Sequence, residues 1–249
     1  MVQSLGAVIY LRTAKILRLA DFAAQFHQLW PGTPLVEEGK QGNAAYFSMG
    51  ETHLAVEVKS TTVPQAVTDA VLDSTRHWPD ARKELGPHVA HVTVGSSGGG
   101  SNGLDIASHI TKAIVALVRV TDSIGVCWLN GPVVHASRQF SAIAVEMFHL
   151  GRLPLMLWIA ACWKPEERVI HTTGMVQFDA PEILIAKQPI RSTELIAYLF
   201  DAANYILRSG NMVVDGETME GPNGVLKIES VTGKDSKKRA LILVPVQPN

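Results

Sequence analysis

The sequence predicts an α+β protein built from two ferredoxin-like halves, each with the element order β-α-β-β-α-β, packed as one unit by a pseudo-duplication. In residues 1–95, strand-like apolar runs alternate with helical patterns in that order. Residues 124–249 repeat the order with additions. We therefore expect a first α+β half over residues 1–95, a Gly-rich connector and linking helix over 96–123, and a second α+β half with extra strands over 124–249.

The elements of the first half follow from local patterns. Residues 6–11 form an apolar run typical of a strand, and apolar residues then recur at helical spacing over 19–30 until Pro31. Residues 44–59 contain two strand-like runs around a Gly50 turn, which predicts a hairpin. A capping-box pattern over 62–65 predicts the start of a second helix, and residues 88–94 predict the closing strand.

The second half matches the first in pattern order. The strand predicted at 125–129 corresponds to that at 6–11, and the helix that follows it carries apolar residues over 140–147. A helix over 104–120 joins the two halves, and a strand over 153–163 has no counterpart in the first half. Short strands are expected at the end of the chain, around 213–214 and over 225–231 and 240–246.

The composition of the chain limits which kinds of partner it can bind. The chain has 249 residues, of which 47% are hydrophobic and 18% charged, so it can bury a full core. Its formal net charge of −1 offers no basic surface for a phosphate backbone, and we expect no nucleic-acid partner. The one basic cluster lies between two apolar runs and is typical of a solvated hairpin loop; it comprises Lys234, Lys237, Lys238 and Arg239.

The two cysteines indicate a reducing compartment. Cys127 and Cys162 each lie inside an apolar run, where free cysteine behaves as a small hydrophobe, although a disulfide between them stays open. Residues 1–11 lack the positive segment of a signal peptide, and the apolar window at 153–162 is shorter than the ~20 residues that span a bilayer. We expect a cytoplasmic protein with no membrane anchor.

A glycine-rich segment admits two interpretations. Residues 98–103 match G-x-G-x-x-G between a strand and a helix, where a phosphate could bind. The next strand, however, leads into Asn130 and not into the acidic residue that a dinucleotide site needs. A flexible connector over Gly95 to Gly103 is therefore favoured, with nucleotide sensing as the alternative.

Common catalytic and metal-binding motifs are missing. The sequence has no H-E-x-x-H, C-x-x-C or Walker A element. His88 and His91 are three apart in a predicted strand, so they face opposite sides and cannot bind one metal ion. We expect no metal and no cofactor, and histidines that satisfy local hydrogen bonds.

Three polar residues are the candidates for chemistry. His135 falls at a strand-to-helix junction, just before a helix that Ser137 is expected to cap. His171 starts one strand, and Glu182 starts its expected hairpin partner, so Glu182 could face His171 or His135 as an acid-base pair. Cross-strand polar pairing without chemistry produces the same pattern.

Three tryptophans in the same region are candidates for binding. Trp128, Trp158 and Trp163 lie on predicted strands. Large aromatic side chains can line a pocket or fill a core, and core is the default interpretation.

Several segments together resemble a known family. They are the W-x-x-G-x-V-V-H element at 128–135, the apolar run at 153–163, H-T-T-G-M-V-Q-F-D-A-P-E at 171–182 and N-M-V-V-D-G-E-T-M-E-G at 211–221. They resemble the bacterial domain of unknown function 4261, with the resemblance running from about residue 88 to 246. It implies a bacterial, mostly cytoplasmic protein without an assigned activity.

Two functions follow as hypotheses. The first is a non-catalytic protein-binding or adaptor module with a protein partner, such as an immunity or accessory protein, because the catalytic signatures are missing and the charge is near neutral. The alternative is a hydrolase or transferase of a small molecule or peptide, which would use His135, His171 and Glu182, with or without a metal ion.

Overall fold

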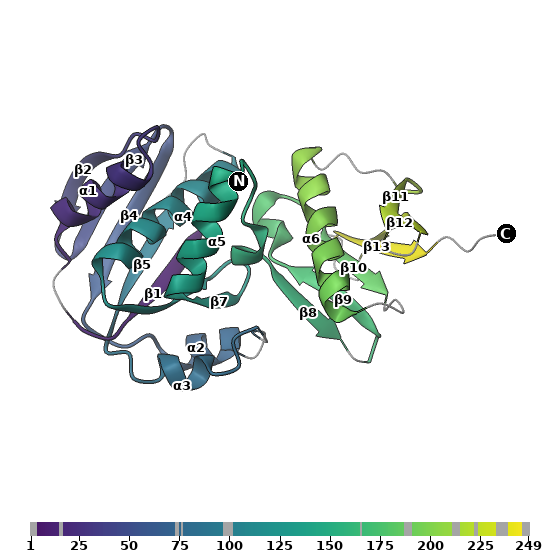
Figure 1. Ribbon diagram of the computed structural model, residues 1–249, viewed down its shortest axis with the longest axis horizontal. Coiled ribbons are helices and arrows are strands. Elements are labelled where there is room, and N and C mark those ends of the chain that lie inside the picture. The colour runs from purple at the N-terminus through teal and green to yellow at the C-terminus, as the bar shows by residue number, and fades with distance from the viewer. Residues whose placement is uncertain are drawn as a thin grey trace. The chain divides into compact units, whose positions relative to one another are not determined.

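The computed structural model describes residues 4–14, 17–72, 75, 77–96, 102–164, 166–186, 191–210, 215–221, 224–232 and 239–245. The chain forms two compact units, Met1–Trp158 and Ile159–Asn249. Each unit contains its own sheet, of seven strands in the first and six in the second (Figure 1).

The first unit contains the longer sheet and most of the helices. Its strands are β1 (Gly6–Leu11), β2 (Val36–Gln41), β3 (Ala44–Met49), β4 (Thr52–Lys59), β5 (Ala90–Ser96), β6 (Ser123–Trp128) and β7 (Val133–Ala136). Its helices are α1 (Leu19–Leu29), α2 (Gln65–Leu72), α3 (Ala81–Leu85), α4 (Gly103–Val120), α5 (Ser137–His149) and the 3₁₀ turn η1 (Leu155–Leu157).

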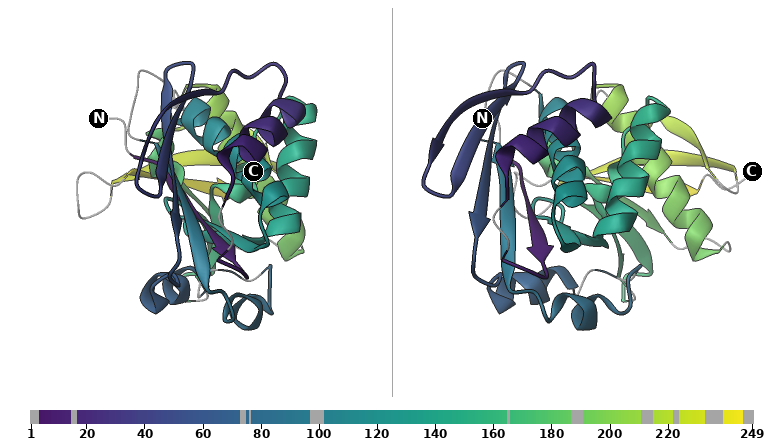
Figure 2. Two further views of the ribbon diagram at one scale, coloured as in Figure 1. Left: turned by 90° about the vertical axis from the view of Figure 1, so that its left-hand side faces the viewer. Right: turned by 60° about the vertical axis from the view of Figure 1, so that its left-hand side comes forward.

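Neighbouring strands of the first sheet are all antiparallel, in the order β2-β3-β4-β5-β1-β6-β7. Helices α1, α4 and α5 cover one face, as Figure 2 shows. Helix α4 is central because its apolar stripe packs on the sheet, with Ile106, Ile110 and Ile114 fully buried. This layer is the main core of the unit.

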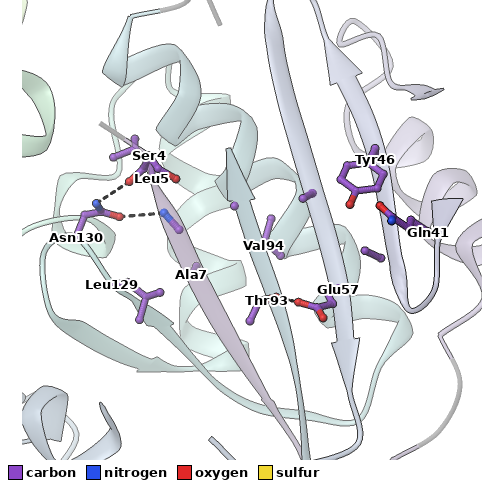
Figure 3. Close-up of a pocket in the computed structure, with 14 residues that line it drawn as sticks. Ser4, Leu5, Ala7, Gln41, Tyr46, Glu57, Thr93, Val94, Leu129 and Asn130 are labelled. Carbon is purple, nitrogen blue, oxygen red and sulfur yellow. Dashed lines mark hydrogen bonds between the residues drawn. The ribbon is translucent and has the colours of Figure 1, made fainter. Parts of the chain in front are cut away.

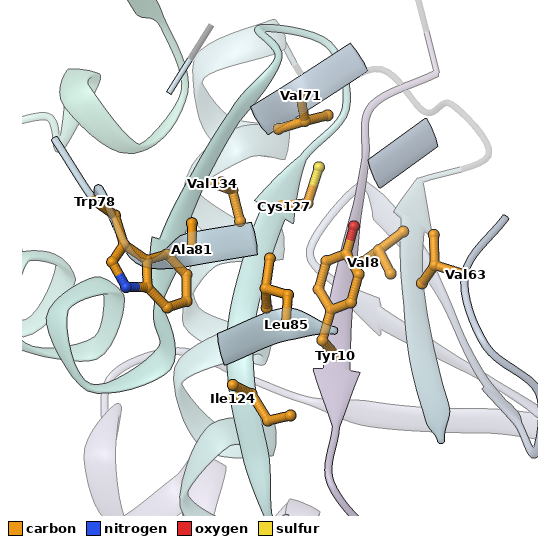
Figure 4. Packing of buried hydrophobic residues seen from close by; sticks show 10 residues of the cluster. All are labelled: Val8, Tyr10, Val63, Val71, Trp78, Ala81, Leu85, Ile124, Cys127 and Val134. Atoms are coloured by element: carbon orange, nitrogen blue, oxygen red, sulfur yellow. The ribbon is translucent and has the colours of Figure 1, made fainter. Parts of the chain in front are cut away.

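Helices α2 and α3 cover part of the opposite face. Val8 and Tyr10 of β1 enter a buried cluster with Trp78 and Leu85 from the α2–α3 segment (Figure 4). Strand alternation directs Ile9 to the other face. The α2–α3 segment contacts the end of the sheet formed by β6 and β7. Strands β3, β4 and β5 therefore present a stretch of this face that α2 and α3 do not cover.

The second unit is a mixed sheet with one long helix. Its elements are β8 (Ala160–Lys164), β9 (Val169–Thr173), the 3₁₀ turn η2 (Met175–Phe178), β10 (Glu182–Ala186), α6 (Ser192–Arg208), β11 (Thr218–Gly221), β12 (Gly224–Thr232) and β13 (Arg239–Pro245). The strand order is β11-β12-β13-β10-β9-β8, and only β10 and β13 pair in parallel among the described strands. Helix α6 packs against β9 and β10 through Leu199 and its neighbours.

The structure confirms a mixed α+β fold, but the strand order differs from the ferredoxin-like prediction. In a ferredoxin-like half the first strand lies between the third and the fourth, whereas here β5 lies between β4 and β1. Strand β2 was not expected. Strands β6 and β7, which were assigned to a repeated second half, complete the first sheet through β1.

The boundary between units also differs from the expected connector at 96–123. Helix α4, predicted as a linking helix, packs on the sheet that precedes it, and the contacts divide after Trp158. The strand expected over 153–163 is a 3₁₀ turn followed by the shorter β8. Local apolar runs reveal that an element forms but not which sheet it joins.

Candidate functional site

His135 lies on β7 and is 2% exposed. Its Nε2 is 2.9 Å from the Met156 carbonyl oxygen, so Nε2 donates to that carbonyl. Burial lowers the pKa of His135 to about 4, which keeps the ring neutral at pH 7. The His77 ring stands 4.3 Å away between centroids. This is a buried histidine with a structural hydrogen bond.

The cap predicted at Ser137 is wrong. Helix α5 begins at Ser137, and its N-cap residue is Ala136, which provides no side-chain hydrogen bond. The Ser137 hydroxyl is buried without a hydrogen-bond partner among the described residues. Strand β7 runs directly into the helix, which leaves no separate turn residue to act as a cap.

His171 and Glu182 lie in the second unit, whereas His135 lies in the first. The structure therefore does not bring the three together in one unit. Nδ1 of His171 is 2.9 Å from the Thr172 carbonyl oxygen. The Glu182 carboxylate accepts hydrogen bonds from Thr172 Oγ1 at 2.6 Å and from the amides of Gly174 and Met175 at 2.8 and 3.0 Å.

These three hydrogen bonds give Glu182 a structural role. Gly174 has a φ of 119°, so the chain makes a sharp turn between β9 and η2. The carboxylate pairs the amides of that turn, which would otherwise lack partners in a partly buried position. Glu182 thereby fixes the connection between β9 and β10.

The tryptophans are mostly core residues. Trp128 and Trp158 are fully buried, and their ring centroids are 6.1 Å apart. Nε1 of Trp158 donates to Thr111 Oγ1 at 2.8 Å. Neither indole presents a surface to a partner. Trp163 lies on β8 in the second unit and is partly buried.

His88 and His91 satisfy hydrogen bonds, as predicted, but they do not share a strand, because β5 begins at Ala90 and His88 precedes it. The His88 ring accepts from the Val63 amide at 2.8 Å through Nε2 and donates to the Leu85 carbonyl at 2.7 Å through Nδ1. Nδ1 of His91 lies 2.7 Å from the Thr61 carbonyl oxygen. The His88 ring links the end of α3 to the segment that precedes α2, and the His91 ring links that segment to β5.

Three predicted features fall wholly or largely outside the described residues, and the strand expected around 213–214 is one of them. Of the glycine-rich segment, residues 97–101 are not described, and Asn102 caps α4 by accepting from the Asp105 amide at 2.9 Å. The basic cluster lies within residues 233–238 and the undescribed side chain of Arg239. In the described part of the chain, no group of three or more His, Cys, Asp or Glu is placed to hold a metal ion.

The uncovered stretch of the first sheet is hollowed. A cavity of about 630 Å³, called here the sheet trough, lies on this face (Figure 3). The residues that line it are Ser4, Leu5, Gly6, Ala7, Gln41, Ala44, Tyr46, Ala55, Glu57, Thr93, Val94, Gly95, Leu129 and Asn130.

Strand register arranges most of these residues in two rows across the strands. The first row runs Tyr46, Ala55, Gly95, Gly6, Leu129, because each is paired or hydrogen-bonded to the next. The second row runs Gln41, Ala44, Glu57, Thr93. Strands lie about 4.8 Å apart, so the first row is about 19 Å long, and the rows are about 7 Å apart.

The floor of the sheet trough has almost no side chains. Gly6 and Gly95 face each other across β1 and β5, and Ala55 lies opposite Gly95 on β4. The walls are apolar: Tyr46 is 38% exposed and Leu129 is 44% exposed. The result is a shallow apolar slot with an aromatic ring at one end.

Among the described residues, nothing requires glycine at these two positions. Neither Gly6 nor Gly95 has a positive φ, and a Cβ on either would meet its nearest atoms at 3.6 Å, an ordinary contact. Glycine in a strand interior weakens the strand and often marks a place where a ligand or another backbone approaches closely. The glycine pair is therefore a feature that the packing of the described residues does not explain.

The polar side of the sheet trough carries one charge. Among the residues that line it, Glu57 alone is charged. Its carboxylate is 3.1 Å from Lys59 Nζ and 3.5 Å from Thr93 Oγ1, and both members of the ion pair are 42% exposed. The Asn130 amide closes the other end by donating to the Ser4 carbonyl and accepting from the Gly6 amide.

Sequence reasoning did not single out these residues as a site. The available signal was weak, because Gly6 begins one predicted strand, whereas Gly95 was assigned to the connector that follows the strand predicted at 88–94; the structure places Gly95 in β5. That signal needed the register, because only pairing of β1 with β5 brings the two glycines together.

The two units define an α+β protein with two separate sheets, a class that includes many unrelated functions. Residues 171–241 match the model of the family described as Domain of unknown function (DUF4261). The matched segment is therefore similar to this family, and it contains two of the motifs that carry the resemblance, at 171–182 and 211–221. No curated protein and no solved structure matches it.

The matched segment is shorter than the resemblance expected from the sequence. It lies within the second unit, whereas the W-x-x-G-x-V-V-H element and the sheet trough lie in the first. None of the helices in the described part of the chain combines the length and apolar character needed to cross a membrane.

Proposed function

We propose that this protein is a non-catalytic protein-binding or adaptor module that takes a segment of its partner into the sheet trough. The observation that carries the proposal is the uncovered pair Gly6 and Gly95, whose missing side chains serve neither the backbone nor the packing of the chain. A concave apolar surface with a few polar groups at its rim is the usual form of a binding site.

The dimensions support an extended segment as the occupant. The first row is about 19 Å long, which five or six residues of extended chain span at about 3.3 Å each. Apolar walls at Tyr46 and Leu129 would bury side chains of the segment, and such buried anchors supply most of the energy of a protein interface.

The setting that we propose is the cytoplasm of a bacterium. Cys127 and Cys162 are both free, which fits a reducing compartment. An immunity or accessory protein would be one module of this kind.

An enzyme that acts through His135, His171 and Glu182 has less support. Glu182 already accepts three hydrogen bonds, and His135 is buried and belongs to the other unit.

The test is a partner capture with matched variants. Tagged wild-type protein, Ala55→Arg and Val67→Arg are expressed in the host cells, and co-purifying proteins are quantified by mass spectrometry. Ala55 lies on the floor of the sheet trough, whereas Val67 is an exposed residue of α2 outside it. We expect a stoichiometric protein that wild type and Val67→Arg retain and Ala55→Arg loses.

The fold of each variant is checked by its urea unfolding midpoint. Equal recovery of every partner by all three proteins would refute the proposal. So would the reproducible absence of a partner after mild crosslinking.

A further inference from the structure

The α2–α3 segment shows how this sheet face accepts a large side chain. Trp78 packs on Gly125, so closely that a Cβ there would lie 3.2 Å from two atoms of its ring. Gly125 pairs with Tyr10, and Gly6 lies on the same face of β1 as Tyr10, because residues of a strand alternate. One glycine of this face therefore receives an aromatic ring, and two more lie uncovered.

The second row of the sheet trough differs from the first because it carries a charge. Glu57 provides its single charge, and the carboxylate is held by the exposed Lys59. Exposed ion pairs contribute little net stability, so a cation from a partner could replace Lys59 at little cost. The Tyr46 ring lies on the neighbouring strand, next to the slot that such a cation would enter.

The distance between these two features sets the spacing of the ligand. Glu57 is one strand and two residues away from Gly95 in the register. One strand spacing of about 4.8 Å and two residues of about 3.4 Å place their Cα atoms roughly 8 Å apart. Side chains two residues apart in an extended peptide are about 7 Å apart and point to the same side.

We infer that the partner segment carries an aromatic side chain, which packs on Gly6 and Gly95, and a lysine or arginine two residues away, which pairs with Glu57. This inference rests on the proposed binding function and names the chemistry of the partner. Apolar contact provides affinity in this arrangement, and the ion pair provides selectivity.

Two synthetic tripeptide amides test the charge requirement: N-acetyl-Trp-Ala-Lys-amide and N-acetyl-Trp-Ala-Glu-amide. Each is titrated into the full-length ¹⁵N-labelled protein, and the amide signals of Glu57, Thr93 and Gly95 are followed by NMR. We expect the lysine peptide to bind about fivefold more tightly than the glutamate peptide, the ratio for an ion pair near 1 kcal/mol. The preference should weaken as salt is added.

Two variants locate the effect at Glu57. Glu57→Gln should abolish the preference for the lysine peptide, and Glu57→Lys should reverse it. Equal binding of both peptides, an unchanged preference in Glu57→Lys, or no saturable shift at these amides would overturn the inference.

The two proposals fail separately. If both peptides bind equally at the sheet trough while Ala55→Arg still loses its cellular partner, the binding function stands and the charge requirement is wrong. If Ala55→Arg keeps every partner, the binding function itself is refuted.

Discussion

Gly125→Ala tests whether the α2–α3 segment packs on the sheet as described. The added Cβ would lie 2.7 Å from Leu85 Cδ2 and 3.2 Å from two ring atoms of Trp78. Leu85 is 1% exposed and Trp78 is 9% exposed, so neither has open space into which to move. Overpacking of this kind destabilises by about 1–3 kcal/mol.

Gly125→Ala should lower the free energy of unfolding by about 2 kcal/mol. For an m-value near 2 kcal/mol/M, this loss lowers the urea midpoint by about 1 M. Gly39→Ala is the matched control, because it lies in β2, has no positive φ and would place its Cβ with nothing within 4 Å. Alanine reduces the entropy of the unfolded chain equally at both positions, so the comparison isolates the contact. Equal midpoints for the two variants would refute the packing argument.

Three further predictions concern buried polar groups. Trp158→Phe should lose about 1–3 kcal/mol of unfolding free energy, measured by urea titration, because Thr111 keeps a buried hydroxyl without its indole partner; an unchanged midpoint would contradict this. The pKa of His135 is about 4 in the folded protein and about 6.5 in the unfolded chain. Between these pH values the unfolded state binds more protons, so the free energy of unfolding falls as the pH falls, by about 3 kcal/mol from pH 7 to pH 4. His135→Gln should remove that part of the pH dependence, and parallel stability curves for variant and wild type would argue against it. Burial raises the pKa of the Cys127 thiol to about 12, so iodoacetamide should label the partly exposed Cys162 first in the native protein, as peptide mapping would reveal; equal rates would disprove the burial of Cys127.

Local patterns predicted most elements but not their partners. The strand at residues 6–11 and the helices around α1, α4 and α5 follow from apolar spacing, which records the period of each element. Pairing between strands depends on contacts across long sequence separations, which one sequence does not display. The ferredoxin-like order failed for this reason, since β5 could be placed on either side of β1 by pattern alone.

The candidate site shows the same limit. His171 and Glu182 stood out because their residue types can do chemistry, yet Glu182 binds the amides of its own turn. Gly6 and Gly95 have no side-chain functional group, so the sequence alone did not mark them as candidates. Their meaning comes from register, which places both on one uncovered face.

The place of β1 in the first sheet affects how the chain can fold during synthesis. Ala7 pairs with Val94 on one side and Trp128 on the other, so the first strand to be made receives both neighbours late. Pairings with large sequence separation form slowly because the loop between them must close first. Strand β1, with its row of unpaired amides and carbonyls, therefore lacks its β5 partner until residue 96 has been translated and its β6 partner until residue 128, and a chaperone that shields it over this interval would raise the yield of folded protein.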